Sequence, residues 1–551
     1  MCLGLLLRMS IAIALIFGLL FAFAMMIAFY LEYIGMVEGI WVLIIPLALA
    51  CIVVTLQWGI SPYIVKWIYK IVWIGPEQGF LDPRYERMYR SVEAMARDSN
   101  VKVPMVGVVP DDNPNAFAFG WTRNKSHLVL TNGVFKYCDD DEAETVAAHE
   151  MGHIVHNDFV VMTVITAIVL TFFIIARWAF RIGRLAGRSR NGGALGVAVA
   201  GIGAISFLMY LIANFISLLV SRYREYWADR YSAETTKKPN KLSSALVKIA
   251  YGLATEGRGL DVDDRRKQDA HHSNALMFFS VHSARGLAVQ STTASGTLEK
   301  GAIKDTMSWD LWNPWGFFYE LNMTHPLPAK RILALNKLAE EQGQMPFIVF
   351  DKEQPESYWD DFLGDIMAKW SFIWGFVIAV FMVLFGYDDI ILMGGLTLAW
   401  AGLFGFLYFR FYRHPLAFKD ARVRDLLADP KASPVRGTPV RLRGVVIGRG
   451  IPGMFFSEDL KIDDGTGLML IDYKSSARLI DFFQGAFRTH RWVGTEVVVE
   501  GWYRRPVVPM LELLRMEGGG MKRKVWRPYI KMGFALVLLF IGLMVLAVSF
   551  V

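Results

Sequence analysis

Residues 147–176 form the stretch AAHEMGHIVHNDFVVMTVITAIVLTFFIIA. Its first part carries the pattern His-Glu-x-x-His, and its second part is an apolar run without Asp, Glu, Lys or Arg. Roughly 20 apolar residues suffice to cross the hydrocarbon core of a bilayer. A candidate metal-binding helix therefore leads directly into a candidate membrane-spanning helix.

Long apolar runs recur along the 551 residues, of which 54% are hydrophobic, above the usual range for soluble proteins. Seven stretches approach or exceed the length of a membrane span, and none contains a charged residue. They are residues 9–31, 39–65, 159–176, 191–221, 370–387, 390–409 and 532–551. We predict a mainly α-helical, polytopic membrane protein with about seven transmembrane helices.

The chain has three scattered cysteines, Cys2, Cys51 and Cys138, and no Cys-x-x-Cys pair. This pattern excludes a disulfide framework and a thiolate metal site. The formal charge of +7 could indicate a nucleic-acid partner. In a membrane protein, such a charge is more typical of cytoplasmic loops rich in Lys and Arg.

Basic residues gather at one end of the predicted spans. Lys66 and Lys70 follow the second span, Arg410 and Arg413 follow the sixth, and a basic cluster at 522–527 precedes the last. Cytoplasmic loops of membrane proteins are enriched in Lys and Arg. We therefore expect the soluble parts of the chain, including the one that carries the His-Glu-x-x-His pattern, on the cytoplasmic side of the plasma (inner) membrane.

The loop between the third and fourth spans does not fit this pattern. It holds five arginines between positions 177 and 190, although simple alternation places it outside. Either the hairpin at 159–221 is partly re-entrant, or its helices run long and the arginines meet lipid headgroups. The sequence leaves both alternatives open.

The His-Glu-x-x-His pattern has the spacing of a metal site. His149 and His153 are four residues apart, so on a helix they share one face and can bind one metal ion. Glu150 follows the first histidine and could accept a proton from water activated by the metal. Asp141 and Glu144 have the spacing of a capping box, which predicts a helix start there. The alternative is two ordinary surface histidines on a helix.

A catalytic zinc needs a third protein ligand and an open position. The third histidine of the extended motif is absent, but the segment SRYREYWAD at 221–229 offers Glu225 and Asp229 on one helical face. Glu225 could bind the metal while Asp229 orients a histidine. The alternative is that both acids pair with neighbouring arginines on a solvated face. The hairpin at 159–221 returns Glu225 to the membrane face on which His153 lies.

Four motifs in order along the chain carry a family resemblance. They are NAFAFGW at 115–121, HEMGH at 149–153, REYWAD at 224–229 and THPLPAKRI at 324–332. Together they resemble the HtpX family of membrane zinc metallopeptidases, which is related to the CAAX prenyl proteases. The likeness covers roughly residues 10–340.

The resemblance implies a role for each matching residue. It implies one Zn2+ per chain with Glu225 as the third ligand, and Asp229 and Arg331 as supporting residues. Asn115 is similar to a residue that lines the substrate cleft, and His325 to one that stabilises the oxyanion. From the residues alone, Asn115 and His325 could equally be a turn residue and a helix-capping residue.

A different composition begins near residue 417. Strand-like runs at 439–447, 468–473 and 496–500 alternate with Gly- and Pro-rich turns. About five short strands predict a small antiparallel barrel that resembles an OB-fold, and specifically the soluble domain of NfeD-type membrane proteins. Its aromatic and basic residues could stack single-stranded nucleic acid, but several aspartates crowd the same region. A protein partner is therefore favoured over nucleic acid.

These features predict five segments. They are two transmembrane helices at 1–72, a helical zincin-type peptidase domain at 73–345, a transmembrane pair at 346–413, an OB-like domain at 414–526 and a last transmembrane helix at 527–551.

The resemblance predicts a zinc endopeptidase that cleaves misfolded or unassembled membrane proteins on the cytoplasmic side. One alternative is a CAAX-type prenyl-protein peptidase. The other is a non-catalytic membrane scaffold that uses the OB-like domain for interaction. The scaffold is disfavoured because it has no need of Glu150 between the two histidines.

Overall fold

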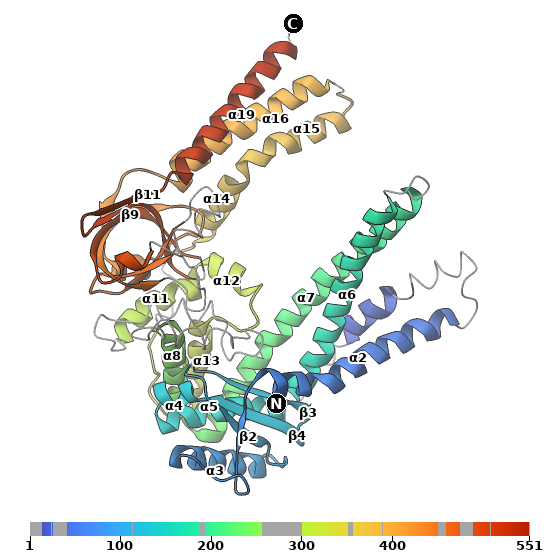
Figure 1. Ribbon diagram of the computed structural model, residues 1–551, viewed down its shortest axis with the longest axis vertical. Helices are drawn as coiled ribbons and strands as arrows, with labels where there is room; N and C mark the ends of the chain where they lie inside the picture. The colour runs from blue at the N-terminus through green and yellow to red at the C-terminus, as the bar shows by residue number, and fades with distance from the viewer. Residues whose placement is uncertain are drawn as a thin grey trace.

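The computed structural model describes residues 11, 14–23, 25, 41–112, 114–187, 193–255, 300–350, 356–387, 389–449, 459–473, 489–506 and 508–549. It confirms the predicted fold class of a mainly helical membrane protein with a small β-barrel (Figure 1). Among these residues, six helices are long and apolar enough to span a membrane. They are Cys51–Ile68, Asp158–Ala186, Gly196–Thr236, Trp359–Leu384, Ile390–Arg413 and Arg527–Ser549. The remaining predicted span, 9–31, lies partly outside the described residues, and Ala14–Phe23 within it is a shorter apolar helix.

One group of apolar helices comprises α2 (Trp41–Ile68), α6 (Asp158–Ala186) and α7 (Gly193–Thr236). Helices α6 and α7 pack together along their length, and α2 packs on α6 (Figure 1). Helix α6 is continuous through Arg177, Arg181 and Arg184. Its 29 residues extend for roughly 43 Å, which exceeds the ~30 Å hydrocarbon core. This favours the long-helix alternative, in which the arginines reach the headgroups, over a re-entrant turn.

A second group comprises α14 (Trp359–Trp370), η3 (Ser371–Ile373), α15 (Trp374–Leu384), α16 (Ile390–Leu407), η4 (Tyr408–Arg413) and α19 (Arg527–Ser549). Helices α16 and α19 approach closely at glycines, as small residues allow in membranes. A Cβ on Gly402 would lie 2.2 Å from Leu539 N, and one on Gly542 would lie 2.2 Å from Ala399 N. Both groups leave the soluble part of the molecule in the same direction (Figure 1).

The segment predicted as a helical peptidase domain also contains a sheet that the sequence analysis missed. Its strands are β1 (Val72–Ile74), β2 (Met105–Val109), β3 (Ala116–Thr122) and β4 (Lys125–Thr131). Among the described residues the order is β1-β2-β4-β3, with β2 and β4 parallel and the other pairs antiparallel. Strand β3 therefore forms one edge of this sheet.

Seven helices complete the peptidase segment among the described residues. They are α3 (Pro83–Asp98), α4 (Asn132–Tyr137), α5 (Asp140–Val155), α8 (Pro239–Thr255), α11 (Lys300–Trp312), α12 (Pro314–Glu320) and α13 (Pro328–Glu341). One buried apolar cluster joins α3, α5, α8 and α13 to the sheet. Helix α5, which carries the two histidines, lies in this core because most of its side chains are buried.

The C-terminal soluble part is a closed barrel of five strands among the described residues (Figure 1). The strands are β6 (Thr438–Arg449), β7 (Leu460–Asp463), β8 (Leu468–Asp472), β9 (Glu496–Arg504) and β10 (Met510–Gly518), joined in the ring β6-β7-β8-β10-β9. This confirms the OB-like architecture. The predicted antiparallel pairing holds for four of the five strand pairs in this ring, and it is wrong for β8 and β10, which pair in parallel. The likeness to NfeD-type domains stays a prediction.

The described barrel aromatics that could have stacked nucleobases are buried. Trp502 and Tyr503 have no exposed surface, and Tyr473 and Trp492 are also buried. Two further candidates, at 455 and 456, lie outside the described residues. The described aromatics are therefore not available for stacking with nucleobases.

The barrel is not isolated from the peptidase segment. Trp309 of α11 and Trp315 of α12 belong to the same buried cluster as Val440 and Leu442 of the barrel. Helix α11 also packs on α17 (Val423–Ala428), which precedes the barrel strands. The predicted domain boundaries stay a prediction, but the end of the peptidase segment packs directly against the barrel.

Candidate active site

Helix α5 begins with a capping box nearly three turns before His149, the first active-site residue. The Glu142 backbone N–H donates to Asp139 Oδ1, and the Asp139 N–H donates to Glu142 Oε2, both at 2.8 Å. The predicted capping pair, Asp141 and Glu144, is wrong by two residues. These two side chains instead accept from Lys238 Nζ at 2.9 and 2.7 Å.

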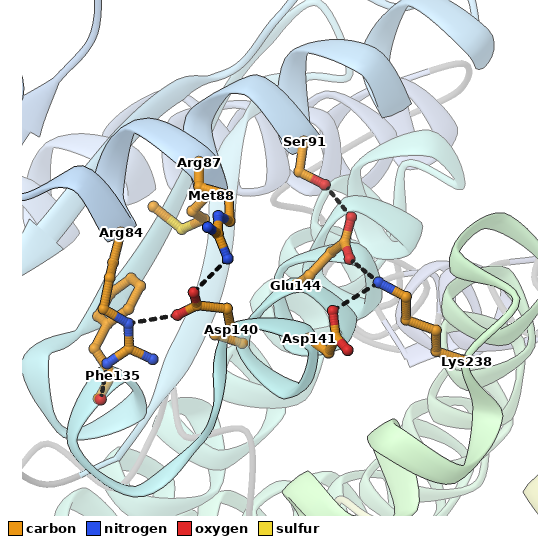
Figure 2. Close-up of a pocket in the computed structure, with 10 residues that line it drawn as sticks. Arg84, Arg87, Met88, Ser91, Phe135, Asp140, Asp141, Glu144 and Lys238 are labelled. Atoms are coloured by element: carbon orange, nitrogen blue, oxygen red, sulfur yellow. Dashed lines mark hydrogen bonds and ion pairs between the residues drawn. The ribbon is translucent and has the colours of Figure 1, made fainter.

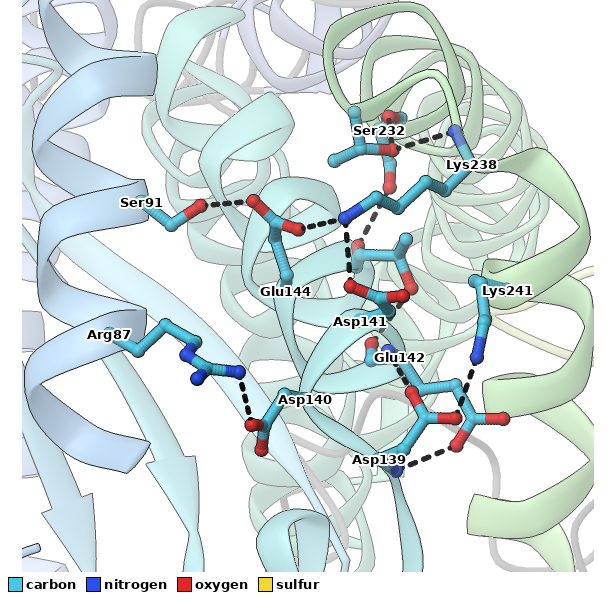
Figure 3. A network of polar contacts seen from close by, with 12 residues as sticks. Arg87, Ser91, Asp139, Asp140, Asp141, Glu142, Glu144, Ser232, Lys238 and Lys241 are labelled. Atoms are coloured by element: carbon cyan, nitrogen blue, oxygen red, sulfur yellow. Dashed lines mark hydrogen bonds and ion pairs between the residues drawn. The ribbon is translucent and has the colours of Figure 1, made fainter. Parts of the chain in front are cut away.

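Basic side chains from both neighbouring helices hold the acidic first turn of α5 (Figure 3). Arg84 and Arg87 of α3 pair with Asp140. Lys241 and Lys248 of α8 pair with Asp139 and Glu142. Acidic residues at a helix N-terminus are also favoured by the helix dipole. The start of the histidine-bearing helix is thus fixed from two sides.

A cavity of about 220 Å³ lies within this network, between α3 and α5 (Figure 2). Arg84, Arg87, Asp140, Glu144 and Lys238 line it, and they pair with one another across it. The residues that line this cavity do not include His149, Glu150 or His153. It is therefore a feature of the helix support and separate from the candidate active site.

The structure brings the two histidines and Glu225 together. His149 Nε2 lies 3.5 Å from Glu225 Oε2, and His153 Nε2 lies 3.6 Å from Glu225 Oε1. His149 and Glu225 are buried, and the His153 side chain is 12% exposed. Glycine allows this approach of α5 and α7, because a Cβ on Gly152 would lie 3.1 Å from Ala228 Cα. The predicted return of Glu225 to the histidines is therefore present in the fold.

The solvated-face alternative for the two acids does not hold. Glu225 and Asp229 are each 1% exposed. Arg224 does lie 3.5 Å from Glu225, but Asp229 pairs with Arg331 of α13 and not with an arginine of its own helix. The acids face a buried centre.

Each histidine is oriented through its second ring nitrogen. His149 Nδ1 lies 2.9 Å from Asp229 Oδ1, and Arg331 holds that carboxylate with two hydrogen bonds of 2.8 and 2.6 Å. His153 Nδ1 lies 2.8 Å from Oδ2 of the buried Asp158. Carboxylates at Nδ1 leave the Nε2 lone pairs for a shared cation. The sequence analysis missed Asp158, although an acid at the head of an apolar run was a signal.

At both Glu150 and His149, burial and the neighbouring charges act on the pKa in opposite directions. Burial raises the pKa of Glu150, although His153 and His149 oppose the shift. Burial lowers the pKa of His149, but its contacts with Asp229 and Glu225 outweigh this and raise it to about 9. The acids therefore create a site that favours a positive charge.

The structure also places His325 in this cluster. Its Nδ1 lies 3.0 Å from Glu225 Oε2, and Arg331 Nη1 lies 3.7 Å from the same oxygen. Asn115 stands directly before the edge strand β3 and is buried. Its backbone N–H donates to Thr131 Oγ1 at 2.8 Å. A role for Asn115 toward substrate stays a prediction.

The donor set fits a zinc ion. Ligand atoms of His149, Glu150 and His153 lie within 4.8 Å of one another. Tetrahedral zinc with bonds of ~2.0–2.1 Å places its ligand atoms about 3.4 Å apart. The distances of 3.5 and 3.6 Å from the imidazoles to Glu225 match this spacing. Two imidazoles and one carboxylate could therefore hold zinc, and Glu150 lies close to both histidines.

Comparisons with known proteins agree with this geometry. The profile of peptidase family M48 matches residues 83–339. The chain is 32% identical to a protease HtpX homolog of Methanothermobacter thermautotrophicus, over 46% of this chain and 88% of the relative. It is 31% identical to the homolog of Aeropyrum pernix, over 54% and 86%, and 30% identical to that of Thermoplasma acidophilum, over 60% and 95%.

A crystal structure of S. mikatae Ste24p aligns over 59% of this chain and 64% of its own, with 16% identity and a TM-score of 0.33. That similarity is too low to support an argument. The barrel lies outside the residues that match the family profile.

Proposed function

The chain belongs to peptidase family M48, and on that basis we propose that it is a membrane-embedded zinc endopeptidase. One observation carries the proposal: the Nε2 atoms of His149 and His153 lie 3.5 and 3.6 Å from the carboxylate oxygens of the buried Glu225. His149, His153 and Glu225 hold one Zn2+ per chain in this proposal. Asp229 and Asp158 orient the histidines, and the contacts at 2.9 and 2.8 Å support that role.

A zinc ion bound there would act as a Lewis acid that polarises the scissile carbonyl and makes water acidic near neutral pH. Glu150 accepts the proton of the attacking water and delivers it to the leaving amine. Its place next to His149, within 4.8 Å of the histidine donors, supports that role. His325, beside the ligand Glu225, donates a hydrogen bond to the developing oxyanion.

The substrate binds as an extended strand in this proposal. Strand β3 is an edge of its sheet among the described strands and packs against the histidine helix α5. An exposed strand edge can pair with an extended peptide through main-chain hydrogen bonds. Asn115 stands at the start of β3, where it would hold the substrate backbone.

The substrates are misfolded or unassembled membrane proteins, cleaved on the cytoplasmic side of the plasma (inner) membrane. Two observations support a cut close to the membrane. The apolar helix α6 begins at Asp158, which contacts His153 directly. Both groups of apolar helices also leave the soluble part on the same side (Figure 1). The barrel would then bind substrate or a partner protein.

Two variants of the detergent-purified protein test the proposal. Glu150→Gln keeps the side-chain shape but cannot accept the proton, so it should retain one zinc and lose roughly 10²–10⁴-fold in peptide cleavage. Glu225→Ala removes a ligand and should lose both zinc and activity. Zinc analysis and a peptide-cleavage assay on the same samples separate the two outcomes.

Controls keep this test specific. Asp141→Asn, an exposed change on the same helix, should leave both zinc content and rate unchanged. Wild-type cleavage by Glu150→Gln would exclude it as the base, and full zinc occupancy in Glu225→Ala would place the third ligand elsewhere. Cleavage only of prenylated peptides would support the prenyl-protein peptidase instead.

A further inference from the structure

His325 reaches the site on the loop between α12 and α13, and a buried arginine of α7 holds that loop. Arg222 is 8% exposed. Its Nη1 donates to the carbonyl oxygens of Glu320 at 2.6 Å and Met323 at 3.0 Å. These carbonyls lie at the end of α12 and just before His325. The helix that supplies Glu225 thus also fixes the path of the chain toward His325.

The same loop folds back against α11 and α12. The Leu327 backbone N–H donates to Glu320 Oε1 at 3.2 Å, and Lys330 pairs with the other oxygen of that carboxylate. The Leu327 side chain lies against Gly316, where an added Cβ would meet Leu327 Cδ1 at 3.4 Å and Asp310 O at 3.3 Å. The position of the loop therefore depends on where α11 and α12 lie.

The barrel in turn holds α11. Arg505, which has no exposed surface, donates Nη2 to Thr306 O at 2.6 Å and Nη1 to Leu427 O. Its guanidinium stacks 4.9 Å from the centre of the Trp309 ring. Trp309 Nε1 donates to Ala432 O at 2.8 Å. Buried donors are costly to leave unpaired, so this contact resists separation of α11 from the barrel.

The start of α12 is held in the same way. The Asn313 side chain accepts from the Trp315 backbone N–H at 2.9 Å and donates to Pro430 O at 2.8 Å. Trp315 Nε1 donates to the buried Asp365 of α14 at 2.7 Å. Both helices before the His325 loop are therefore tied to the barrel and to the second group of membrane helices.

We propose that Arg505 of the barrel and Arg222 of α7 are positioning residues for His325. The inference rests on the proposed peptidase function and deepens it. Arg505 fixes the α11–α12 segment (residues 300–320), and Arg222 fixes the loop that continues from it to His325. A displacement of about 1 Å in a reacting group can cost 10²-fold in rate. The barrel lies outside residues 83–339, which match the family profile, and in this proposal it helps to position an active-site residue.

The first test uses Arg505→Lys in the full-length protein. Lysine keeps the charge but cannot bridge Thr306 and Leu427 with a planar fork. We expect kcat for a short peptide to fall roughly 10- to 100-fold, while KM and zinc content stay close to wild type. Arg515→Lys is the matched control, because Arg515 pairs with Glu500 on the barrel, and not with α11. Wild-type kcat in Arg505→Lys would overturn the proposal.

A double-mutant cycle shows whether the effect passes through His325. If Arg505 acts by positioning His325, then Arg505→Lys should have no further effect on kcat in a His325→Ala background. The same holds for Arg222→Lys, which should retain more activity than Arg222→Ala. Multiplicative losses in the double variants would mean that the arginines act independently of His325, and would overturn the proposal.

A milder variant covers the case in which Arg505→Lys fails to fold. Trp309→Phe keeps an aromatic ring beside Arg505 but removes the indole N–H that donates to Ala432 together with some buried volume, and it should lower kcat in the same cycle. Trp309→Phe with wild-type kcat contradicts the proposal. A wild-type protein without zinc or cleavage would instead contradict the proposed function, so the two failures are distinguishable.

Discussion

Replacing Asp158 with asparagine should weaken zinc binding without removing a ligand. Asp158 is fully buried, and its Oδ2 lies 2.8 Å from His153 Nδ1. Asparagine preserves the size and an oxygen acceptor, but it removes the negative charge that makes the imidazole a stronger donor to the metal. Loss of such a partner typically costs 10- to 100-fold in metal affinity, or about 1.4–2.7 kcal/mol.

The asparagine oxygen can still accept a hydrogen bond from His153 Nδ1. We therefore expect zinc affinity to fall about tenfold in Asp158→Asn and about a hundredfold in Asp158→Ala. Competition with a chelator in detergent measures the affinity, and cleavage in the Asn variant should recover in excess zinc. Asp141→Asn, with a half-exposed carboxylate on the neighbouring helix, is the control. Unchanged zinc affinity in both Asp158 variants would refute the role of Asp158, and with it the orientation assigned to His153.

Three further predictions follow from close contacts, burial and topology. Gly152→Ala should lower the melting temperature and zinc content together, since its Cβ would press on the Ala228 backbone at 3.1 Å and overpacking costs roughly 1–3 kcal/mol; a wild-type melting curve would contradict this. Burial raises the pKa of Asp310 to about 6 in the folded protein. The protonated carboxyl group therefore stabilises the fold fully below about pH 4, and this contribution to the free energy of unfolding is lost as the pH rises through 6. Asp310→Asn should therefore become more stable relative to wild type by up to about 3 kcal/mol across that window, and a pH-independent difference in unfolding would disprove it. Single cysteines at Lys125 and Asp464, in a background without native cysteines, should be labelled from the same membrane face; labelling from opposite faces would refute the shared orientation.

The membrane helices and the meeting of His149, His153 and Glu225 could be predicted because their signals are local. An apolar run long enough to span a bilayer predicts a transmembrane helix wherever it occurs in the chain. His149 and His153 share a face through helical spacing alone. Glu225 is distant in sequence, but the intervening hairpin returns the chain to the same side. Each inference needed only one helix, or one helix pair, to be right.

The features that the sequence analysis missed depend on contacts between distant segments. Asp158 meets His153 because Asn157 adopts a left-handed conformation, with φ 57°, that turns the chain between α5 and α6. Helical spacing through this turn would not bring them together. Strand β2 pairs in parallel with β4 and not with β3, its neighbour in the sequence, so no hairpin signal reveals this pairing. The parallel β8–β10 pair escaped prediction for the same reason.

The role of α11 and α12 was also hidden in the sequence. Trp309 and Trp315 look like ordinary apolar residues of the peptidase segment, yet they belong to the same buried cluster as residues of the barrel. Their partners, such as Arg505, follow far along the chain, and a buried arginine cannot be distinguished from an exposed one by its neighbours in sequence. Only the folded chain shows that the barrel contacts the segment before His325.

X-ray absorption at the zinc edge of the purified full-length protein tests the central claim most directly. Two histidines and Glu225 predict a first coordination sphere of nitrogen and oxygen alone, at ~2.0–2.2 Å, with scattering from two imidazole rings. Glu225→Gln should weaken or alter that signal, whereas Glu150→Gln should leave it unchanged. A sulfur ligand near 2.3 Å, a third imidazole, or a spectrum that does not respond to Glu225→Gln would contradict the site proposed for this protein.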